Sequence, residues 1–221
     1  GGGSGGSLYV TAGTIAGAGT IAADGGSSPT ASNHGGGGGG GRIALYYGST
    51  GFTGAVSAHG GQGCVIGGAG TLYTKEGNSV GQLLLENGGN SGAHTRLHQD
   101  FWPESITFAL DIRRGAVGTV NHLLTFDSLL VGDQGTLTHP AQSNIFDIEV
   151  INSATVDTGG RISADGLGHP QGTGDGAGSA SNYNGGGGGY GGAGGNGRNS
   201  TGGPAYGSEE YPGELGSGGG R

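Results

Sequence analysis

The sequence predicts an all-β protein, a parallel β-helix (β-solenoid) with polyglycine tracts, or alternatively a β-sandwich with polyglycine II layers. Short segments rich in Val, Ile, Thr and Tyr alternate with Gly-rich turns, as expected for strands and not for helices. In addition, residues 42 to 61 repeat residues 7 to 26 with an offset of 35 residues. Repeats of this length are typical of stacked coils.

The repeat predicts which residues stack on one another. The offset of 35 residues aligns Leu8 with Ile43 and Ile21 with Val56, and a third copy that begins at Gly68 adds Leu72. Later in the chain, residues 155 to 166 align without gaps on residues 14 to 25, so that Ile162 falls on Ile21. In a β-helix like residues stack on like, so we expect two internal ladders, Leu8/Ile43/Leu72 and Ile21/Val56/Ile162.

Glycine dominates the composition, with 61 of 221 residues. There is no Gly-X-Y period, which excludes collagen, and apolar clusters such as Leu83 to Leu85 indicate a folded chain. The longest tract, Gly35 to Gly41, leads directly into the strand-like segment at Arg42. We expect such tracts to pack as extended segments in the polyproline II conformation, where only glycine permits close backbone approach. The alternative is a flexible surface loop.

Composition divides the chain into three parts, which we expect to form one continuous domain. Residues 1–89 and 151–221 are glycine-rich repeat parts, and 90–150 is a denser β core segment. In that middle part the strands expected are Ser105 to Ile112, His122 to Val131 and Ile145 to Ile151. Joined head to tail, the last residues would run into Gly1 and form another glycine tract before a strand, which predicts a unit of a tandem array.

Charge and hydropathy exclude two classes of partner. Eight basic residues against sixteen acidic ones give a formal charge of −8, which repels nucleic acid. No run approaches the roughly 18 apolar residues that cross a bilayer, so no membrane insertion is expected. The single cysteine, Cys64, lies between Gly63 and Val65 and is expected to be a small buried hydrophobe.

Three segments share the pattern of a Gly-rich tract, a strand and a Gly-Gly or Asp-Gly ending: residues 19–26, 54–61 and 160–166. This pattern resembles the glycine-rich β-helical repeats of large secreted or cell-surface proteins that are adhesin-like or fibre-forming. It is more weakly similar to the polyglycine layers of phage tail-tip adhesins. The resemblance implies an extracellular or cell-surface location and a structural or adhesive role, and it brings no catalytic residues.

A polar cluster precedes the middle strands and is the first candidate for a binding site. It consists of His94, Arg96, His98, Asp100 and Trp102. The first four would share one face of a strand, and two histidines with a carboxylate could hold a transition metal, while the tryptophan suits a sugar platform. The alternative is a polar linker into the core that Trp102 caps.

Acidic residues suggest two further sites. Asp24 and Asp165 follow strands at matching places, and Asp175 lies in a Gly-Thr-Gly-Asp-Gly stretch, so calcium could bind at these residues, the alternative being polar turns. Asp147 and Glu149 share one strand face and could act as the acid and base of a polysaccharide-degrading β-helix enzyme. Alternating charge on a solvated sheet face explains that pair equally well.

The function expected is that of a non-catalytic extracellular structural protein, a β-solenoid unit of a fibre, surface layer or giant adhesin. Its partners would be copies of itself or neighbouring repeats. One alternative is a carbohydrate- or receptor-binding adhesive module that recognises surface glycans. A second alternative is the polysaccharide-degrading enzyme, and calcium is the one cofactor considered.

Overall fold

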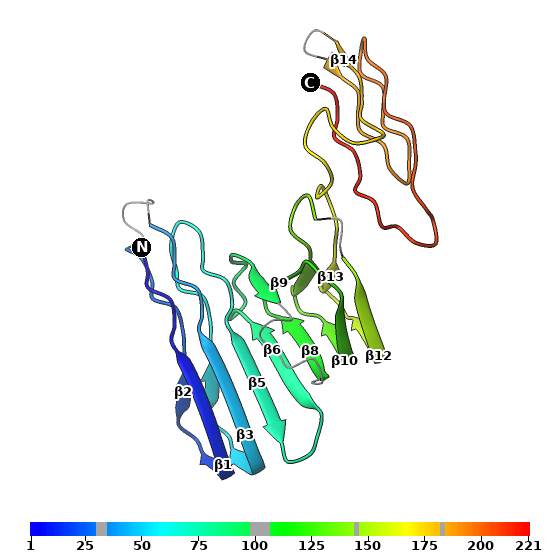
Figure 1. The fold of residues 1–221 in the computed structure, drawn as a ribbon. Helices are drawn as coiled ribbons and strands as arrows, with labels where there is room; N and C mark the ends of the chain where they lie inside the picture. Colours follow the sequence, from blue (N-terminus) through cyan, green and yellow to red (C-terminus); the bar gives the residue numbers. More distant parts are fainter. Residues whose placement is uncertain (30–34, 98–106, 144–145, 182–183) are drawn as a thin grey trace. The chain divides into compact units, whose positions relative to one another are not determined.

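The computed structural model describes residues 1–29, 35–97, 107–143, 146–181 and 184–221 (Figure 1). These residues form strands and turns and no helix, which confirms the all-β prediction. No helix long and apolar enough to span a membrane occurs in the described chain. The chain divides into two compact units: a first unit of residues 1–138 and 147–163, and a second of residues 139–146 and 164–221. This division does not coincide with the three compositional parts.

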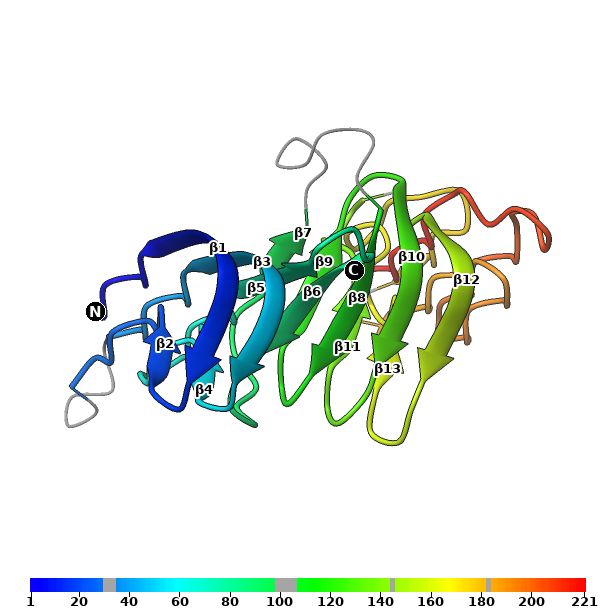
Figure 2. The same ribbon diagram turned by 90° about the horizontal axis from the view of Figure 1, so that it is seen from below.

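The first unit is built on a seven-stranded sheet (Figures 1 and 2). Its strands lie in the order β1 (Ser7–Gly17), β3 (Arg42–Phe52), β5 (Thr71–Glu76), β6 (Gly81–Glu86), β8 (Phe108–Arg113), β10 (Leu124–Val131) and β12 (Ile148–Val156). Neighbouring strands are parallel except for the antiparallel pair β5 and β6.

Two smaller parallel sheets complete this unit. One has two strands, β2 (Thr20–Ala22) and β4 (Ala55–Ser57). The other has four strands, in the order β13 (Arg161–Ile162), β11 (Thr136–Thr138), β9 (Val117–Val120) and β7 (Thr95–Leu97). From β8 to β13 the chain alternates between the seven-stranded and the four-stranded sheet.

The register of the sheets follows the sequence repeat. Leu8 pairs with Ile43, Ile43 with Leu72, and Ile21 with Val56, so the first ladder and the beginning of the second are confirmed. Ile162 is the exception, because it pairs with Leu137 in the four-stranded sheet. The prediction was wrong there. Residues 155–166 resemble residues 14–25 in sequence, but sequence similarity between two segments does not make them neighbours in a sheet.

The hydrophobic core changes sides of the seven-stranded sheet at the β5–β6 hairpin. Residues directly opposite in an antiparallel pair share a face, so Leu72 shares one face with Leu84 and Tyr73 shares the other with Leu83. Leu72 packs on the cluster that contains Ile43, under the two-stranded sheet. Leu83, in contrast, is buried on the opposite face.

That opposite face is covered by the four-stranded sheet. Leu83 and Leu85 pair with Leu110 and Ile112 of β8, and all four side chains are buried. A Cβ added at Gly118 of β9 would lie 2.9 Å from Ile112 Cδ1, so β9 packs directly on this layer. The two small sheets therefore cover opposite faces of one large sheet.

The middle of the chain supplies most of the core, as predicted. Seven of the eleven largest fully buried side chains lie between residues 90 and 150, among them Phe126 and Val131. The predicted middle strands are observed with shifted ends, and β12 runs on to Val156. Ile151 in β12 is 57% exposed, and it lies where the pairing with β10 shifts register between Val150 and Ser153.

The glycine tracts of the first unit form what we call the polyglycine lattice, made of residues 1–6, 23–28, 35–41 and 58–70. Gly2 and Gly5 donate hydrogen bonds to Gly36 and Gly39, and Gly37 and Gly40 donate to Val65 and Gly68. This spacing of three residues is the period of a polyproline II helix. The tracts therefore pack against one another, which confirms the packed interpretation and rejects the flexible loop.

Close packing explains why glycine is required at most positions of the lattice. A Cβ added at Gly38 would lie 1.9 Å from Gly3 O, and one at Gly40 would lie 2.0 Å from Ala58 O. Both obstacles are backbone atoms, which cannot turn away as a side chain can.

Cys64 is exposed, so the prediction of a buried thiol was wrong. The Cys64 N–H donates to Gly35 O at 2.9 Å, which holds its backbone on the lattice, while the side chain faces solvent beside the exposed Val65. Apolar neighbours in the sequence predicted burial of this side chain. The prediction fails because the lattice packs backbone against backbone and leaves side chains such as Cys64 outside.

The second unit is packed in the same way with little regular sheet. Its strands β14 (Ala180–Ser181) and β15 (Asn184–Gly185) form a short antiparallel pair. Most of its order comes from glycine segments: Gly187 donates to Gly195, and Gly203 donates to Gly187. A Cβ at Gly203 would lie 1.7 Å from Gly176 O.

Candidate functional site

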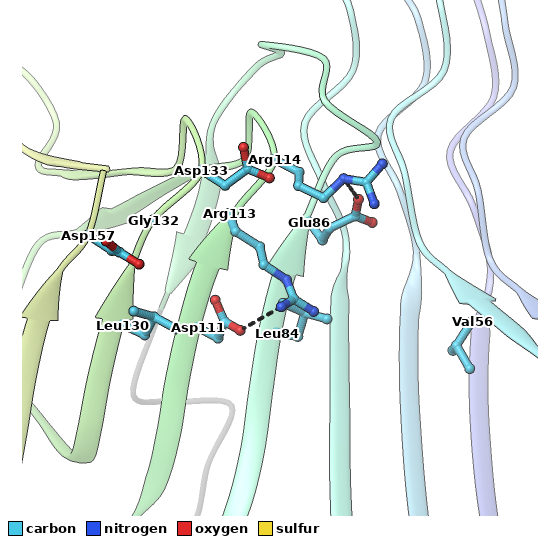
Figure 3. A pocket seen from close by; sticks show the side chains of 10 residues that line it. All are labelled: Val56, Leu84, Glu86, Asp111, Arg113, Arg114, Leu130, Gly132, Asp133 and Asp157. Carbon is cyan, nitrogen blue, oxygen red and sulfur yellow. Dashed lines mark ion pairs between the residues drawn. The ribbon is translucent and has the colours of Figure 1, made fainter. Parts of the chain in front are cut away.

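A groove runs over the part of the seven-stranded sheet that neither small sheet covers. Its volume is about 510 Å³, and ten residues of the first unit line it: Val56, Leu84, Glu86, Asp111, Arg113, Arg114, Leu130, Gly132, Asp133 and Asp157 (Figure 3). The floor is a row across three strands, because Asp111 of β8 pairs with Leu84 of β6 and with Leu130 of β10. Val56 of β4 stands at one side.

The groove exists because the core changes faces. Beyond the β5–β6 hairpin, the four-stranded sheet covers the face of Leu83 and Leu85, and the face of Leu84 is left open. The hollow continues along the same face over a further row that includes Gln82, Ala109 and Ser128, with a volume of about 450 Å³.

Ion pairs organise the polar side chains of the groove. Arg113 Nη1 lies 3.4 Å from Asp111 Oδ2, and Arg114 Nε lies 3.0 Å from Glu86 Oε1 (Figure 3). Asp111 Oδ1 is buried and has no hydrogen-bond partner among the described residues. Burial raises the pKa of the Asp111 carboxyl, and the guanidinium of Arg113 acts in the opposite direction.

A chain of hydrogen bonds ties the rim of the groove to the two-stranded sheet. Glu86 Oε2 bonds to His59 Nε2 of the imidazole ring, and the backbone N–H of His59 donates to Asp24 Oδ1 at 2.7 Å. Asp24 Oδ2 accepts a hydrogen bond from Ser57 Oγ at 2.9 Å. These hydrogen bonds link Glu86 at the end of β6 to the segments that follow β2 and β4.

The lining favours a polar ligand that is not an anion. Four carboxylates, of Glu86, Asp111, Asp133 and Asp157, stand against the two guanidinium groups of Arg113 and Arg114. Carboxylates and guanidinium groups both form strong hydrogen bonds with hydroxyl groups. A hydroxyl-rich ligand such as a glycan fits this chemistry better than a phosphate does.

The structure describes part of the polar cluster predicted from the sequence. His94 lies just before β7 and Arg96 lies within it, and both are exposed. The remaining members, His98, Asp100 and Trp102, lie outside the described residues. None of the described members lines the groove.

The three residues considered for calcium are exposed and lie in two units. Asp24 belongs to the first unit, and Asp165 and Asp175 belong to the second. Within the described ranges, no group of three or more His, Cys, Asp or Glu side chains is arranged to hold a metal ion. Thermal unfolding with and without a chelator tests the calcium hypothesis, and an unchanged melting temperature would reject it.

The paired carboxylates face solvent, as the alternation in the sequence indicated: Glu149 lies in β12 and Asp147 immediately before it. Asp147 and Glu149 are both exposed, and Glu149 Oε2 accepts a hydrogen bond from Thr125 Oγ1 at 3.1 Å. Neither lines the groove.

The residues that line the groove were not among the candidates predicted from the sequence. Asp111 and Arg113 alternate with the apolar Leu110 and Ile112, a pattern that marks two charged side chains on the outer face of a strand. The sequence therefore showed that Asp111 and Arg113 point away from the core. It did not show that this outer face is an open groove, because the groove depends on the change of core side at the β5–β6 hairpin.

Comparison of the chain with protein-family models, with curated proteins and with solved structures gives no significant match. Any functional assignment therefore has to come from the geometry.

Proposed function

We propose that this protein is a non-catalytic structural protein, a β-solenoid unit of an extracellular fibre, surface layer or adhesin. The observation that carries the proposal is the polyglycine lattice. Its hydrogen bonds recur every third residue, and backbone atoms occupy the space beside Gly38 and Gly40 that a side chain would need. Such a lattice offers rigidity and close packing in place of reactive side chains.

The strand order supports the solenoid part of the proposal. Consecutive strands from β8 to β13 alternate between two sheets, and within each sheet every strand lies parallel to the one before it. β1 to β4 follow the same course with the two-stranded sheet. This is how a solenoid coil is repeated.

The energetic balance also suits a structural role. Glycine loses more backbone entropy on folding than any other residue, so a glycine-rich chain needs many hydrogen bonds to offset the loss. In the lattice, Gly38 donates to Gly26 O and accepts from Gly61, so one residue joins two neighbouring segments. Hydrogen bonds between neighbouring segments therefore take the place of side-chain packing in the lattice.

Electron microscopy of the native material tests this proposal. A structural protein of this kind gives filaments or arrays. Discrete monomers at all concentrations, with no filament or array, would reject it.

The groove supports a second candidate function, the binding of a carbohydrate or receptor by an adhesive module. Its open sheet face combines the Asp111–Arg113 ion pair with the apolar Leu84 and Leu130, a combination that can hold both the hydroxyl groups and the apolar face of a sugar. A glycan array probed with the protein and with Arg113→Ala tests this function. Glu149→Gln, outside the groove, is the matched control, and binding unaffected by Arg113→Ala would exclude this site.

A further inference from the structure

Each of the two edge strands of the seven-stranded sheet pairs with one neighbour, β1 with β3 and β12 with β10, and among the described residues no strand pairs with its outer edge. β1 and β12 end the strand order, and they lie at opposite ends of the sheet in Figure 2. β1 is 11 residues long and contains neither a charged residue nor a proline. Natural sheets usually protect such edges with charges, prolines or bulges, because an exposed edge is a template for another strand.

Exposed apolar side chains gather at the same two edges. Leu8, Tyr9 and Val10 are exposed on β1, and Ile151 and Val156 are exposed on β12, with Tyr9 72% accessible. Ile162 of β13, the edge of the four-stranded sheet next in the chain, is exposed as well. Both edges therefore combine unpaired backbone with uncovered apolar surface.

Strand direction decides how two copies can join through these edges. Counted strand by strand across the twisted sheet, the single antiparallel step at β5–β6 reverses the sense of β12 relative to β1. The core lies on opposite faces at the two ends, under the two-stranded sheet at β1 and under the four-stranded sheet at β12. Consider a second copy turned by a half-turn about an axis that lies in the plane of the sheet and runs perpendicular to its strands. This rotation reverses the direction of the strands and exchanges the two faces of the sheet. β1 of that copy then lies parallel to β12, with its two-stranded sheet beside the four-stranded sheet.

The sequences of the two edges match in this orientation. Residues 155–163 align without gaps on residues 14–22, so that Thr155 corresponds to Thr14, Val156 to Ile15 and Ile162 to Ile21. Inside the molecule, neighbouring coils already stack in this manner: Thr14 Oγ1 lies 3.0 Å from Ser49 Oγ, and Ile21 pairs with Val56.

We propose that β12 and β13 of one molecule pair in parallel with β1 and β2 of a second copy turned by this half-turn, with Thr155 beside Thr14 and Ile162 beside Ile21. The contact joins two different edges, so it does not close on itself and it generates an open helical filament. Because the sheet twists, the rotation from one copy to the next is a half-turn plus the accumulated twist of the sheet. The inference rests on the proposed structural function and specifies its partner, a second copy, and its register.

Backbone directions identify substitutions that block one edge each. Gly6 O accepts a hydrogen bond from Arg42 of β3, so in this parallel pair the N–H of Thr11 points to the free edge. Asp157 donates to Val131 O of β10, so the N–H of Ala154 likewise points outward. Thr11→Pro and Ala154→Pro remove these donors, and proline is tolerated on edge strands. Thr11→Ala and Ala154→Ser are the matched controls.

Sedimentation of the full chain measures assembly, and circular dichroism and thermal melting show that each variant is folded. The unchanged protein and both controls are expected to form open-ended polymers that grow with concentration. Each proline variant alone is expected to be monomeric. An equimolar mixture of the two is expected to form dimers and nothing larger, because one free β12 edge meets one free β1 edge.

Several outcomes would overturn the inference. A single proline variant that still dimerises would show a symmetric contact between like edges, and a mixture that stays monomeric would show that these edges do not meet. If both proline variants polymerise like the unchanged protein, this interface is wrong while the structural function stands. If the unchanged protein is monomeric at every concentration, both fail.

A cysteine pair tests the register. In a Cys64→Ser background, Thr14→Cys together with Thr155→Cys is expected to give intermolecular disulfides, because paired residues of neighbouring strands lie within bridging distance. The out-of-register pair of Tyr9→Cys and Thr155→Cys is the control, and equal cross-linking of the two pairs would contradict the proposed register.

Discussion

Adjacent glycines of one tract should respond in opposite directions to the same substitution. An alanine Cβ at Gly38 would lie 1.9 Å from Gly3 O, so the two segments must separate by roughly 1.5 Å to reach an ordinary contact. Three hydrogen bonds meet there: Gly26 to Gly3 O at 2.7 Å, Gly38 to Gly26 O at 3.0 Å, and Gly61 to Gly38 O at 2.7 Å. At about 1 kcal/mol each, their loss costs about 3 kcal/mol.

Gly39 is the matched control in the same tract. The nearest atom to its added Cβ is Gly68 O at 3.9 Å, which is an ordinary contact. Alanine at Gly39 also reduces the freedom of the unfolded chain, so Gly39→Ala is expected to stabilise the protein by about 0.4–1 kcal/mol. The same gain reduces the net loss from Gly38→Ala to about 2 kcal/mol.

Urea unfolding of Gly38→Ala and Gly39→Ala, followed by circular dichroism, measures both free energies. The comparison is internal, because the two variants share composition and differ by one position. If both variants change stability by the same amount, the tract is not packed in the described register and the reasoning is refuted.

Three further predictions test the core and the groove. Asn87→Ala is expected to lower the free energy of unfolding by about 3 kcal/mol, because the fully buried side chain accepts a hydrogen bond from Gly60 N–H at 2.7 Å and donates one to Asn90 O at 2.9 Å. A loss below about 1 kcal/mol in urea unfolding would contradict this bridging role. Phe126→Ala is expected to cost about 3–5 kcal/mol by the same measurement, whereas Tyr9→Ala, on an exposed side chain, should cost far less; similar losses would place the core elsewhere. The raised pKa of Asp111 means that the folded state keeps this proton to a higher pH than the unfolded chain, so the free energy of unfolding should fall as pH rises above the ordinary Asp range. Asp111→Asn should remove that part of the decline, and an unchanged pH profile would show that the carboxyl is not desolvated.

The sequence repeat predicted the register of the first coils, because in stacked parallel strands the offset between copies is the offset between paired residues. Leu8, Ile43 and Leu72 occupy matching places in the three copies of the repeat and lie side by side in the sheet. The packing of the glycine tracts was also predictable, since a run from Gly35 to Gly41 that leads directly into a strand contains none of the serine typical of flexible linkers.

The change of core side could not be predicted from the same patterns. Leu83, Leu84 and Leu85 are all apolar, so the sequence does not show which face is buried. Only the pairing of Leu72 with Leu84 places Leu83 and Leu85 on the face opposite to the first core. The groove and its residue Asp111 depend on this switch, which is why sequence reasoning placed the candidate site elsewhere.

Amide hydrogen exchange along residues 35–41 tests most directly the claim that the glycine tract is a packed lattice. The N–H groups of Gly37, Gly38, Gly40 and Gly41 donate hydrogen bonds to neighbouring segments, and within the described chain Gly39 has no such bond. We predict slow exchange at those four amides and fast exchange at Gly39, a pattern with a period of three residues. Uniformly fast exchange along the tract would show a flexible loop and would contradict the account.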